Sequence, residues 1–143
     1  MGAGKSNTMI NYVTRDKLES YWPVVAPMIQ KALEHSENEI NLEDIHEKIE
    51  NETMGLTTIS GKDGIIACCV CEFVNYPRIR ALRVVALGGS DMDEWMPGLV
   101  QFLESWGKEN KLNRIEQMGR RGWEKALRQY GFKRRYTFMT REI

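Results

Sequence analysis

Apolar and polar residues recur along the chain with two different spacings, and these predict ten secondary-structure elements. Apolar residues that return at helical spacing, with Leu18, Tyr21, Trp22 and Val25 as the clearest set, predict a first helix. Alternating or uniformly apolar short runs predict strands. The predicted strands are 9–13, 55–60, 64–76, 78–87, 113–118 and 132–141, and the predicted helices are 15–35, a short one after Asn41, 93–109 and 122–130.

The order of these elements, β-α-α-β-β-β-α-β-α-β, predicts an α/β (α+β) fold. Gly61-Lys62-Asp63-Gly64 has the residues of a hairpin turn, so the neighbouring strands are expected to be antiparallel. The helix at 93–109 is long enough to be a crossover, so the strands before and after it are expected to be parallel. The prediction is a mixed, mostly antiparallel sheet flanked by helices.

Length and composition predict one domain without a membrane or nucleic-acid partner. The chain has 143 residues, with 20 Lys+Arg and 20 Asp+Glu, so net charge suggests neither partner. Residues 1–8 are expected to be a flexible leader and residues 9–143 a single domain. Because the sequence shows no signal segment and no membrane-spanning run, we expect a cytoplasmic protein.

The distribution of charge along the chain and the positions of the three cysteines add to this picture. The last third is basic: residues 111–143 carry 10 basic and 3 acidic side chains, which suits either an anionic ligand or a solvated face. Cys68, Cys69 and Cys71 lie on one predicted strand, where successive side chains point to opposite faces. We therefore expect small buried hydrophobic residues and no metal site.

The stretch Leu87-Gly88-Gly89-Ser90 is the main candidate for ligand binding. An apolar strand runs into two glycines and then into a helix, and such a junction exposes backbone N–H groups that can hold an anion. The acidic residues that follow, Asp91, Asp93 and Glu94, suit the positive end of a helix. They are expected to cap that helix and to compete with a bound phosphate.

Two further groups could carry chemistry. Glu72 lies in an apolar strand, where burial would disfavour its charge and make it a candidate general base, but it could equally pair with Arg80 or Arg83. Arg120 and Arg121 could bind a phosphate in a forked geometry or be solvated.

From Met9 onward the chain resembles the GNAT superfamily of acyl-CoA N-acyltransferases. It is also similar to a small GNAT-like group common in phages and prophages. The residues that carry the resemblance are Tyr21-Trp22-Pro23, Leu42-Glu43-Asp44-Ile45, Tyr76-Pro77-Arg78, Gly88-Gly89, Glu94-Trp95 and Gly119-Arg120-Arg121-Gly122-Trp123.

The resemblance implies acetyl-CoA as cofactor and an amine on a small molecule or protein as acceptor. It implies that the residues from Leu87 to Ser90, with Arg120 and Arg121, would hold the cofactor, although the family's glycine spacing and basic lead residue are missing. In active relatives a tyrosine four residues before a Gly-Phe pair protonates the thiolate. Leu127 occupies that position here, and Tyr130 lies three residues further on.

Two functions therefore remain open. One is a phage-encoded N-acetyltransferase with a degenerate cofactor loop, in which Glu72 and Tyr130 are the candidate catalytic residues. The other is an inactive GNAT fold that serves as a phage accessory or virion-associated binding module, with a homodimer or a host or virion protein as partner. An enzyme on another small molecule, using Glu72 and the arginine pair, is a further alternative.

Overall fold

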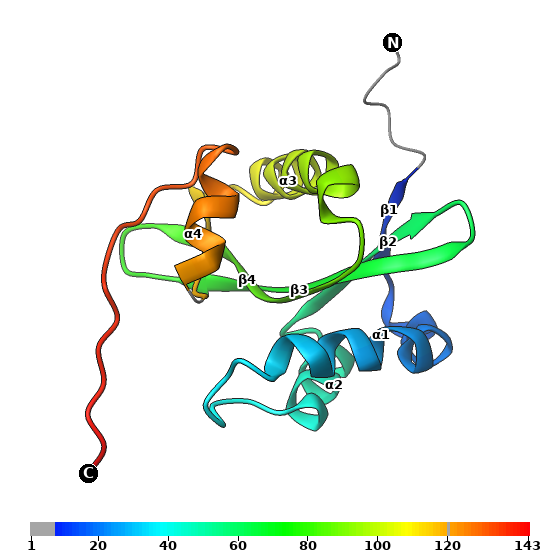
Figure 1. The fold of residues 1–143 in the computed structure, drawn as a ribbon, viewed down its shortest axis with the longest axis horizontal. Helices are drawn as coiled ribbons and strands as arrows, with labels where there is room; N and C mark the ends of the chain where they lie inside the picture. The colour runs from blue at the N-terminus through cyan, green and yellow to red at the C-terminus, as the bar shows by residue number, and fades with distance from the viewer. Residues whose placement is uncertain (1–7, 120) are drawn as a thin grey trace.

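The computed structural model describes residues 8–119 and 121–143, and its centre is one five-stranded sheet (Figure 1). The strands lie in the order of the sequence: β1 (Met9–Val13), β2 (Gly55–Gly61), β3 (Gly64–Asn75), β4 (Arg80–Gly89) and β5 (Arg114–Gln117). Neighbours are antiparallel except β4 and β5, which are parallel. The predicted fold class is thus confirmed, including the parallel pair around the crossover.

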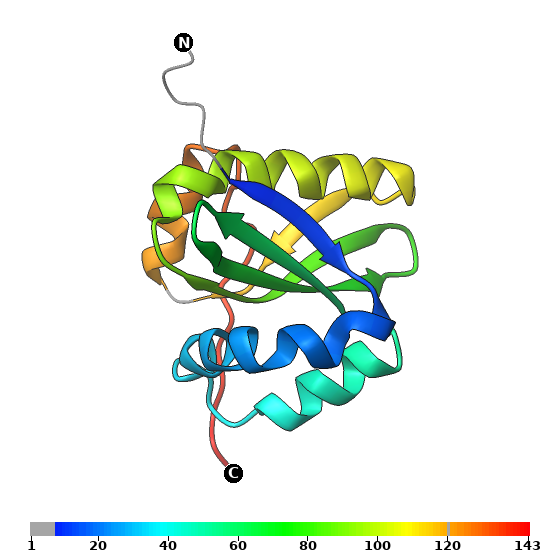
Figure 2. The ribbon, with the colours of Figure 1, turned by 90° about the vertical axis from the view of Figure 1, so that its right-hand side faces the viewer.

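Helices cover both faces of the sheet (Figures 1 and 2). On one face lie α1 (Leu18–Leu33), preceded by the short 3-10 helix η1 (Arg15–Lys17), and α2 (Leu42–Glu50); on the other lie α3 (Met92–Glu109) and α4 (Arg121–Arg128). Asn41 caps α2 as predicted, because its side chain accepts from the Asp44 amide and the Asp44 carboxylate accepts from the Asn41 amide. Among the described residues, no helix is both long and apolar enough to cross a bilayer.

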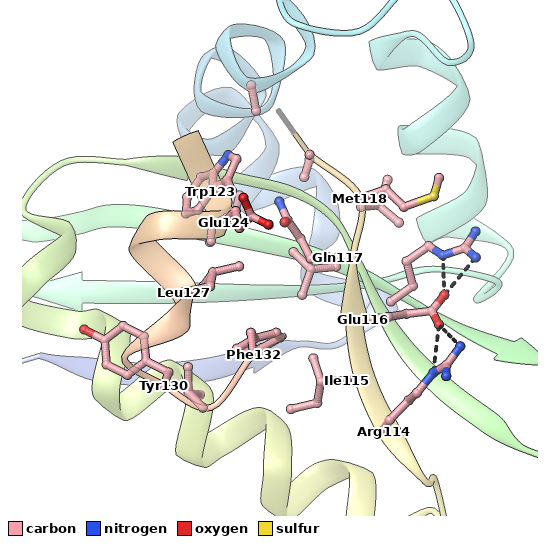
Figure 3. A pocket seen from close by; sticks show the side chains of 18 of the residues that line it. Arg114, Ile115, Glu116, Gln117, Met118, Trp123, Glu124, Leu127, Tyr130 and Phe132 are labelled. Carbon is pink, nitrogen blue, oxygen red and sulfur yellow. Dashed lines mark hydrogen bonds and ion pairs between the residues drawn. The ribbon is translucent and has the colours of Figure 1, made fainter. Parts of the chain in front are cut away.

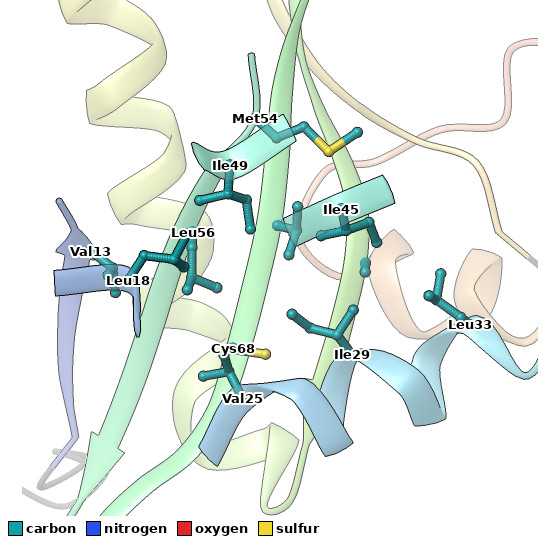
Figure 4. Packing of buried hydrophobic residues seen from close by; sticks show 12 residues of the cluster. Val13, Leu18, Val25, Ile29, Leu33, Ile45, Ile49, Met54, Leu56 and Cys68 are labelled. Atoms are coloured by element: carbon teal, nitrogen blue, oxygen red, sulfur yellow. The ribbon is translucent and has the colours of Figure 1, made fainter. Parts of the chain in front are cut away.

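Two apolar cores hold these layers together. One lies between the sheet and α1 with α2 (Figure 4), and the other lies between the sheet and α3. All three cysteines are free and buried: Cys68 belongs to the first core, and Cys69 and Cys71 belong to the second. The alternation predicted from the sequence is confirmed.

The strand predicted at 132–141 is wrong, because residues 132–143 form no strand. After α4 the chain passes from the α3–α4 layer to beyond the α1–α2 layer, across the edge of the sheet (Figure 1). A segment in that direction cannot build a hydrogen-bond ladder with β5. Its aromatic side chains remain in solvent, with Tyr136 83% and Phe138 77% exposed. We call residues 133–143 the tail.

Strands β4 and β5 separate part of the way along the sheet. Their ladder runs from the Ala81–Arg114 pair to the Val84–Gln117 pair, whereas β4 continues to Gly89. On the β3 side, the register steps from the Val84–Cys71 pair to the Ala86–Val70 pair, so β4 carries one extra residue, Val85. A bulge bends its strand, and this one lies where the ladder with β5 ends. The parting of strands expected near the double glycine is present.

Candidate functional site

A groove of about 2620 Å³ opens along the parting of β4 and β5. Its walls come from the last half of β4, from β5, from the C-terminal end of α1, from α4 and from the tail. Figure 3 shows part of this wall, with β5 facing α4 across the groove. Of the predicted cofactor residues, Leu87, Gly88, Gly89, Ser90 and Arg121 line the groove, and Arg120 lies outside the described residues.

The two glycines are explained by packing within the chain. A Cβ at Gly88 would lie 2.7 Å from the carbonyl oxygen of Met28, so α1 approaches β4 more closely than any side chain allows. Gly89 has a φ of 142°, in the region that favours glycine, and its Cβ would collide with Ile66 and Ala67. Both still pair with β3, opposite Cys68 and Ala67. Their conformation therefore needs no ligand as its explanation.

The start of α3 differs from the expected self-capping arrangement. Asp91 is the N-cap in the left-handed conformation, with φ 57° and ψ 44°, and its side chain makes no capping hydrogen bond. The Ser90 amide donates to the Ile66 carbonyl at 3.0 Å, and the Glu94 amide donates to the Asp91 carbonyl at 2.9 Å. The expected capping by the Asp91 side chain is therefore wrong, whereas Asp93 and Glu94 lie in the first turn of α3 as expected.

A polar network lies on the α1–α2 side of the sheet, where β3, β4 and β5 run together. The Glu116 carboxylate accepts from the Tyr76 hydroxyl at 2.9 Å and from both Arg83 and Arg114, with an Arg83 Nη2–Oε1 distance of 2.8 Å. Dashed lines in Figure 3 join Glu116 to the two guanidinium groups. We call Tyr76, Arg83, Arg114 and Glu116 the Glu116 network, and all four line the groove.

The network fixes the charge of Glu116. Burial by itself raises the pKa of this carboxyl, but hydrogen bonds from Tyr76 and Arg83 and the positive charge of Arg83 outweigh it, so the pKa lies below its usual range. Burial lowers the pKa of Arg83, and its hydrogen bonds to Glu116 and Tyr76 reverse the effect, so its pKa is raised. Glu116 is therefore a stable anion that orients its partners and a poor proton acceptor.

Glu72 lies beside this network rather than in the groove. It pairs across the strands with Arg83, at 3.8 Å between Oε2 and Nη1, and its side chain is 29% exposed. The ion pair with Arg83 is one of the two pairings that the sequence left open. Glu72 is not among the residues that line the groove.

Tyr130 lies on the other side of the sheet from Glu72. It follows α4, lines the groove and, like Trp123, packs against the core that contains Leu127. In Figure 3 its hydroxyl points away from β5, while Leu127 lies between α4 and β5. Leu127 is the buried residue of α4. The structure thus does not bring Glu72 and Tyr130 together, and an aliphatic side chain faces the strand at the position the resemblance assigns to a proton donor.

The sequence analysis missed Glu116 and Tyr76 as site residues. The sequence could have pointed to Glu116, because it is a charged residue next to the apolar Ile115 in the short strand that follows the crossover helix. Tyr76 lies forty residues earlier, and only the pairing of β3, β4 and β5 brings it to Glu116. No spacing rule could have joined these two residues.

One cluster on the α1–α2 side has the residue types of a metal site. Glu19, His46 and Glu50 place ligand atoms within 4.8 Å of one another. Each ring nitrogen of His46 already faces a carboxylate, at 2.6 Å to Glu19 and 3.2 Å to Glu50. The cluster ties α1 to α2 through these contacts and lies outside the groove.

Comparison with known proteins identifies the fold. No protein-family model matches the chain. No curated protein sequence matches it significantly. Solved structures do match over nearly the whole length, and several of them are acetyltransferases.

A predicted acetyltransferase from Clostridium acetobutylicum, solved with acetyl-CoA, has a TM-score of 0.71 at 14% identity and covers 94% of this chain and 96% of its own. The ribosomal-protein-alanine N-acetyltransferase of Brucella melitensis biovar Abortus 2308 has a TM-score of 0.72 at 9% identity, covering 95% and 99%. An aminoglycoside acetyltransferase from an uncultured soil metagenomic sample has a TM-score of 0.69 at 9% identity, covering 96% and 97%. At these identities the likeness shows that the chain shares the fold of these proteins.

Proposed function

We propose that this protein is an acyl-CoA-dependent N-acyltransferase that uses acetyl-CoA, and that the cofactor binds where β4 leaves β5. The observation that carries the proposal is the bulge at Val85, because it ends the β4–β5 ladder and leaves the rest of β4 facing a groove. Unpaired backbone groups in such a place require a partner. The amide groups of a pantetheine arm have the right chemistry for that role.

The residues present fit such a cofactor in part. The backbone from Val85 to Leu87 would pair with the pantetheine amides, and the amides at the start of α3, which no side chain caps, would face the pyrophosphate. Arg121, and Arg120 beside it in sequence, would add positive charge. The carboxylates of Asp91, Asp93 and Glu94 oppose an anion at the same helix start, and this weakens the fit. When bound, acetyl-CoA supplies an acetyl thioester that an amine can attack.

The Glu116 network is the proposed acceptor side of the groove. Glu116 holds Arg83 and Tyr76 in place beside the groove. The acceptor is a small-molecule or protein amine. Glu72, which pairs with Arg83 beside the groove, is the proposed proton acceptor for the attacking amine. Tyr130, which lines the groove, is the proposed proton donor to the thiolate.

The proposal is tested by thermal denaturation with acetyl-CoA and with CoA. Both are expected to raise the melting temperature in a saturable way, because a ligand that binds only the folded state stabilises it. Asp93→Asn removes a repulsive charge from the helix start, so it is expected to bind CoA more tightly while unfolding at a lower temperature. The loss follows from about 0.3–1 kcal/mol of helix-dipole stabilisation.

The matched control is Glu109→Gln, at the other end of the same helix. There a carboxylate opposes the negative helix end, so its removal is expected to leave CoA binding unchanged and stability slightly higher. If Asp93→Asn binds CoA no better than wild type, the pyrophosphate is not held at this helix start. If neither acetyl-CoA nor CoA shifts the wild-type transition, the enzyme proposal fails.

A second function, an inactive GNAT fold that serves as a phage accessory or virion-associated module in the host cytoplasm, has its own support. Leu127 occupies the inward position of α4, and three carboxylates crowd the start of α3. The Gly119–Trp123 stretch carries the resemblance to phage-type sequences. This function predicts no response to acetyl-CoA, together with co-purification of one virion or host protein from phage-infected cells.

A further inference from the structure

We propose that Glu19, His46 and Glu50 form a binding site for one divalent transition-metal ion, with Zn²⁺ as the preferred ion. The three residues lie outside the groove, so the inference does not depend on acyl transfer. It rests on three properties of the cluster: its donor atoms converge, its own side chains leave negative charge uncompensated, and the histidine ring is held in place.

The donor atoms of the three side chains converge from two helices that lie side by side (Figures 1 and 2). Glu19 belongs to α1, whereas His46 and Glu50 are four residues apart on one face of α2. One donor atom from each residue lies within 4.8 Å of the other two. In a tetrahedral zinc site, bonds of about 2.0–2.2 Å place neighbouring donor atoms about 3.3 Å apart. A small adjustment of the side chains therefore gives the geometry of a zinc site.

The ring of His46 is held in place, whereas the two carboxylates can adjust. The ring makes a T-shaped contact with Trp22, at 4.5 Å between centroids, and the His46 side chain is 24% exposed. The side chains of Glu19 and Glu50 are 72% and 54% exposed. A metal ion needs only one nitrogen of the ring, so the carboxylate at the other nitrogen has to turn toward the ion. The solvent around both carboxylates leaves room for this movement and for a water molecule as the fourth ligand.

The charge of the cluster favours a cation. Two carboxylates carry two negative charges and the ring carries at most one positive charge, so the cluster cannot neutralise itself. In the part of the chain that the structure describes, no lysine or arginine pairs with Glu19 or Glu50. Helix α2 adds to the negative field, because its sequence LEDIHEKIE contains four acidic residues and one lysine. Such a field raises the local concentration of cations.

The donor set indicates which ion is bound. Imidazole nitrogen is a common ligand of zinc, copper, iron and nickel, whereas magnesium and calcium prefer oxygen ligands. One imidazole and two carboxylates therefore favour Zn²⁺ over Mg²⁺. The buried side chains of Ile29 on α1 and Ile45 on α2 belong to the same core. The ion would add a polar link between two helices that already share this apolar core.

The test is isothermal titration calorimetry of the full chain, without an affinity tag, with ZnCl₂ and with MgCl₂ at equal ionic strength. Wild type is expected to bind one Zn²⁺ per chain and no Mg²⁺ up to about 1 mM. His46→Gln and Glu19→Gln each remove one ligand. Each is expected to weaken Zn²⁺ binding by at least about tenfold, because the loss of even an outer partner of a metal site costs about 10–100-fold in affinity. Glu19→Gln changes an exposed side chain, so it tests the site even if His46→Gln disturbs the packing against Trp22.

Two matched variants serve as controls. The sequence has 2 histidines, and His35→Gln replaces the one outside the cluster. Glu47→Gln removes an exposed carboxylate that follows His46 on α2 and takes no part in the cluster. Both variants are expected to bind Zn²⁺ with the affinity of wild type. A loss in either control as large as the loss in His46→Gln would contradict the assignment of these ligands.

Cobalt provides a second measurement, because the absorption spectrum of Co²⁺ reports its ligands. At the proposed site Co²⁺ is expected to show only the weak d–d bands of nitrogen and oxygen ligands, and Zn²⁺ is expected to remove them by displacement. Strong thiolate-to-cobalt charge-transfer bands would show that cysteines hold the ion, and would overturn the proposal. So would a wild-type chain that binds no Zn²⁺ up to about 1 mM, or Zn²⁺ binding that His46→Gln leaves unchanged. None of these outcomes bears on acetyl-CoA binding, which is measured separately.

Discussion

Replacing Gly88 with alanine tests how the candidate cofactor strand is held against α1. The new Cβ would lie 2.7 Å from the Met28 carbonyl oxygen and 3.4 Å from its carbonyl carbon, whereas ordinary contact begins at 3.4 Å. The obstacle is helix backbone, which cannot turn aside as a side chain can. Either α1 must move outward or β4 must move toward the groove.

The cost can be estimated from this clash. Moving α1 loosens the contacts that its buried residues, such as Val25 and Ile29, make with the core, and overpacking of this kind costs about 1–3 kcal/mol. For a domain near this size each kcal/mol lowers the melting temperature by about 2–4 °C. Gly88→Ala should therefore melt about 2–12 °C below wild type in a calorimetric or circular-dichroism scan.

The control for this substitution is Gly122→Ala in α4, where an added Cβ meets no atom within 4 Å. Alanine is the better helix former, so this variant should be as stable as wild type or more stable by up to about 1 kcal/mol. If Gly88→Ala melts within about 1 °C of wild type while Gly122→Ala behaves as expected, α1 does not constrain β4 as the structure describes. The glycine pair would then need a different explanation, and a bound ligand becomes the first one to examine.

Three further outcomes follow from the site and the cores. Glu116→Gln should lose about 1–3 kcal/mol at neutral pH, because the hydrogen bonds of Tyr76 and Arg83 to a charged acceptor are weakened. The folded state lowers the pKa of Glu116. The charged Glu116 therefore stabilises the folded protein above the usual pKa of a glutamate, and this stabilisation disappears as the pH falls through the lowered pKa. The free energies of unfolding of wild type and Glu116→Gln, measured as a function of pH, should therefore converge at low pH. Burial raises the pKa of the Cys68 thiol to about 12, so a thiol reagent should label this residue only after denaturation, and rapid labelling of the native protein would contradict its burial. If the protein transfers acetyl groups, Glu72→Gln and Tyr130→Phe should each lower kcat with little change in acetyl-CoA affinity, and full activity in either variant would remove that residue from the proposed chemistry.

Local patterns in the sequence predicted most of the fold. Asn41 and Asp44 form the expected capping box because the signal lies within four residues. The cysteines divide between the two cores because strand alternation is fixed by backbone geometry. The parallel pair was predicted from the length of one helix between two strands. Each of these features depends on neighbours in the sequence.

Features that depend on distant neighbours were predicted less well. The segment at 132–141 has a strand pattern, but a strand needs a partner edge, and no pattern within the segment shows whether one is in reach. Gly88 suggested a ligand because the approach of Met28 from sixty residues away is invisible in the sequence. Asp91 was expected to cap α3, but its backbone is left-handed and its side chain makes no capping hydrogen bond. Glu116 was overlooked because its partners lie on two other strands.

The most direct test of the central claim is hydrogen–deuterium exchange of the full chain with and without acetyl-CoA. Binding at the parting of β4 and β5 predicts slower exchange at Val85–Leu87, where the ladder with β5 has ended, and at Asp91–Asp93, the start of α3. Exchange in β1 and β2, at the far side of the sheet, should stay unchanged. Equal exchange at both places under saturating acetyl-CoA would contradict the claim that this cleft holds the cofactor.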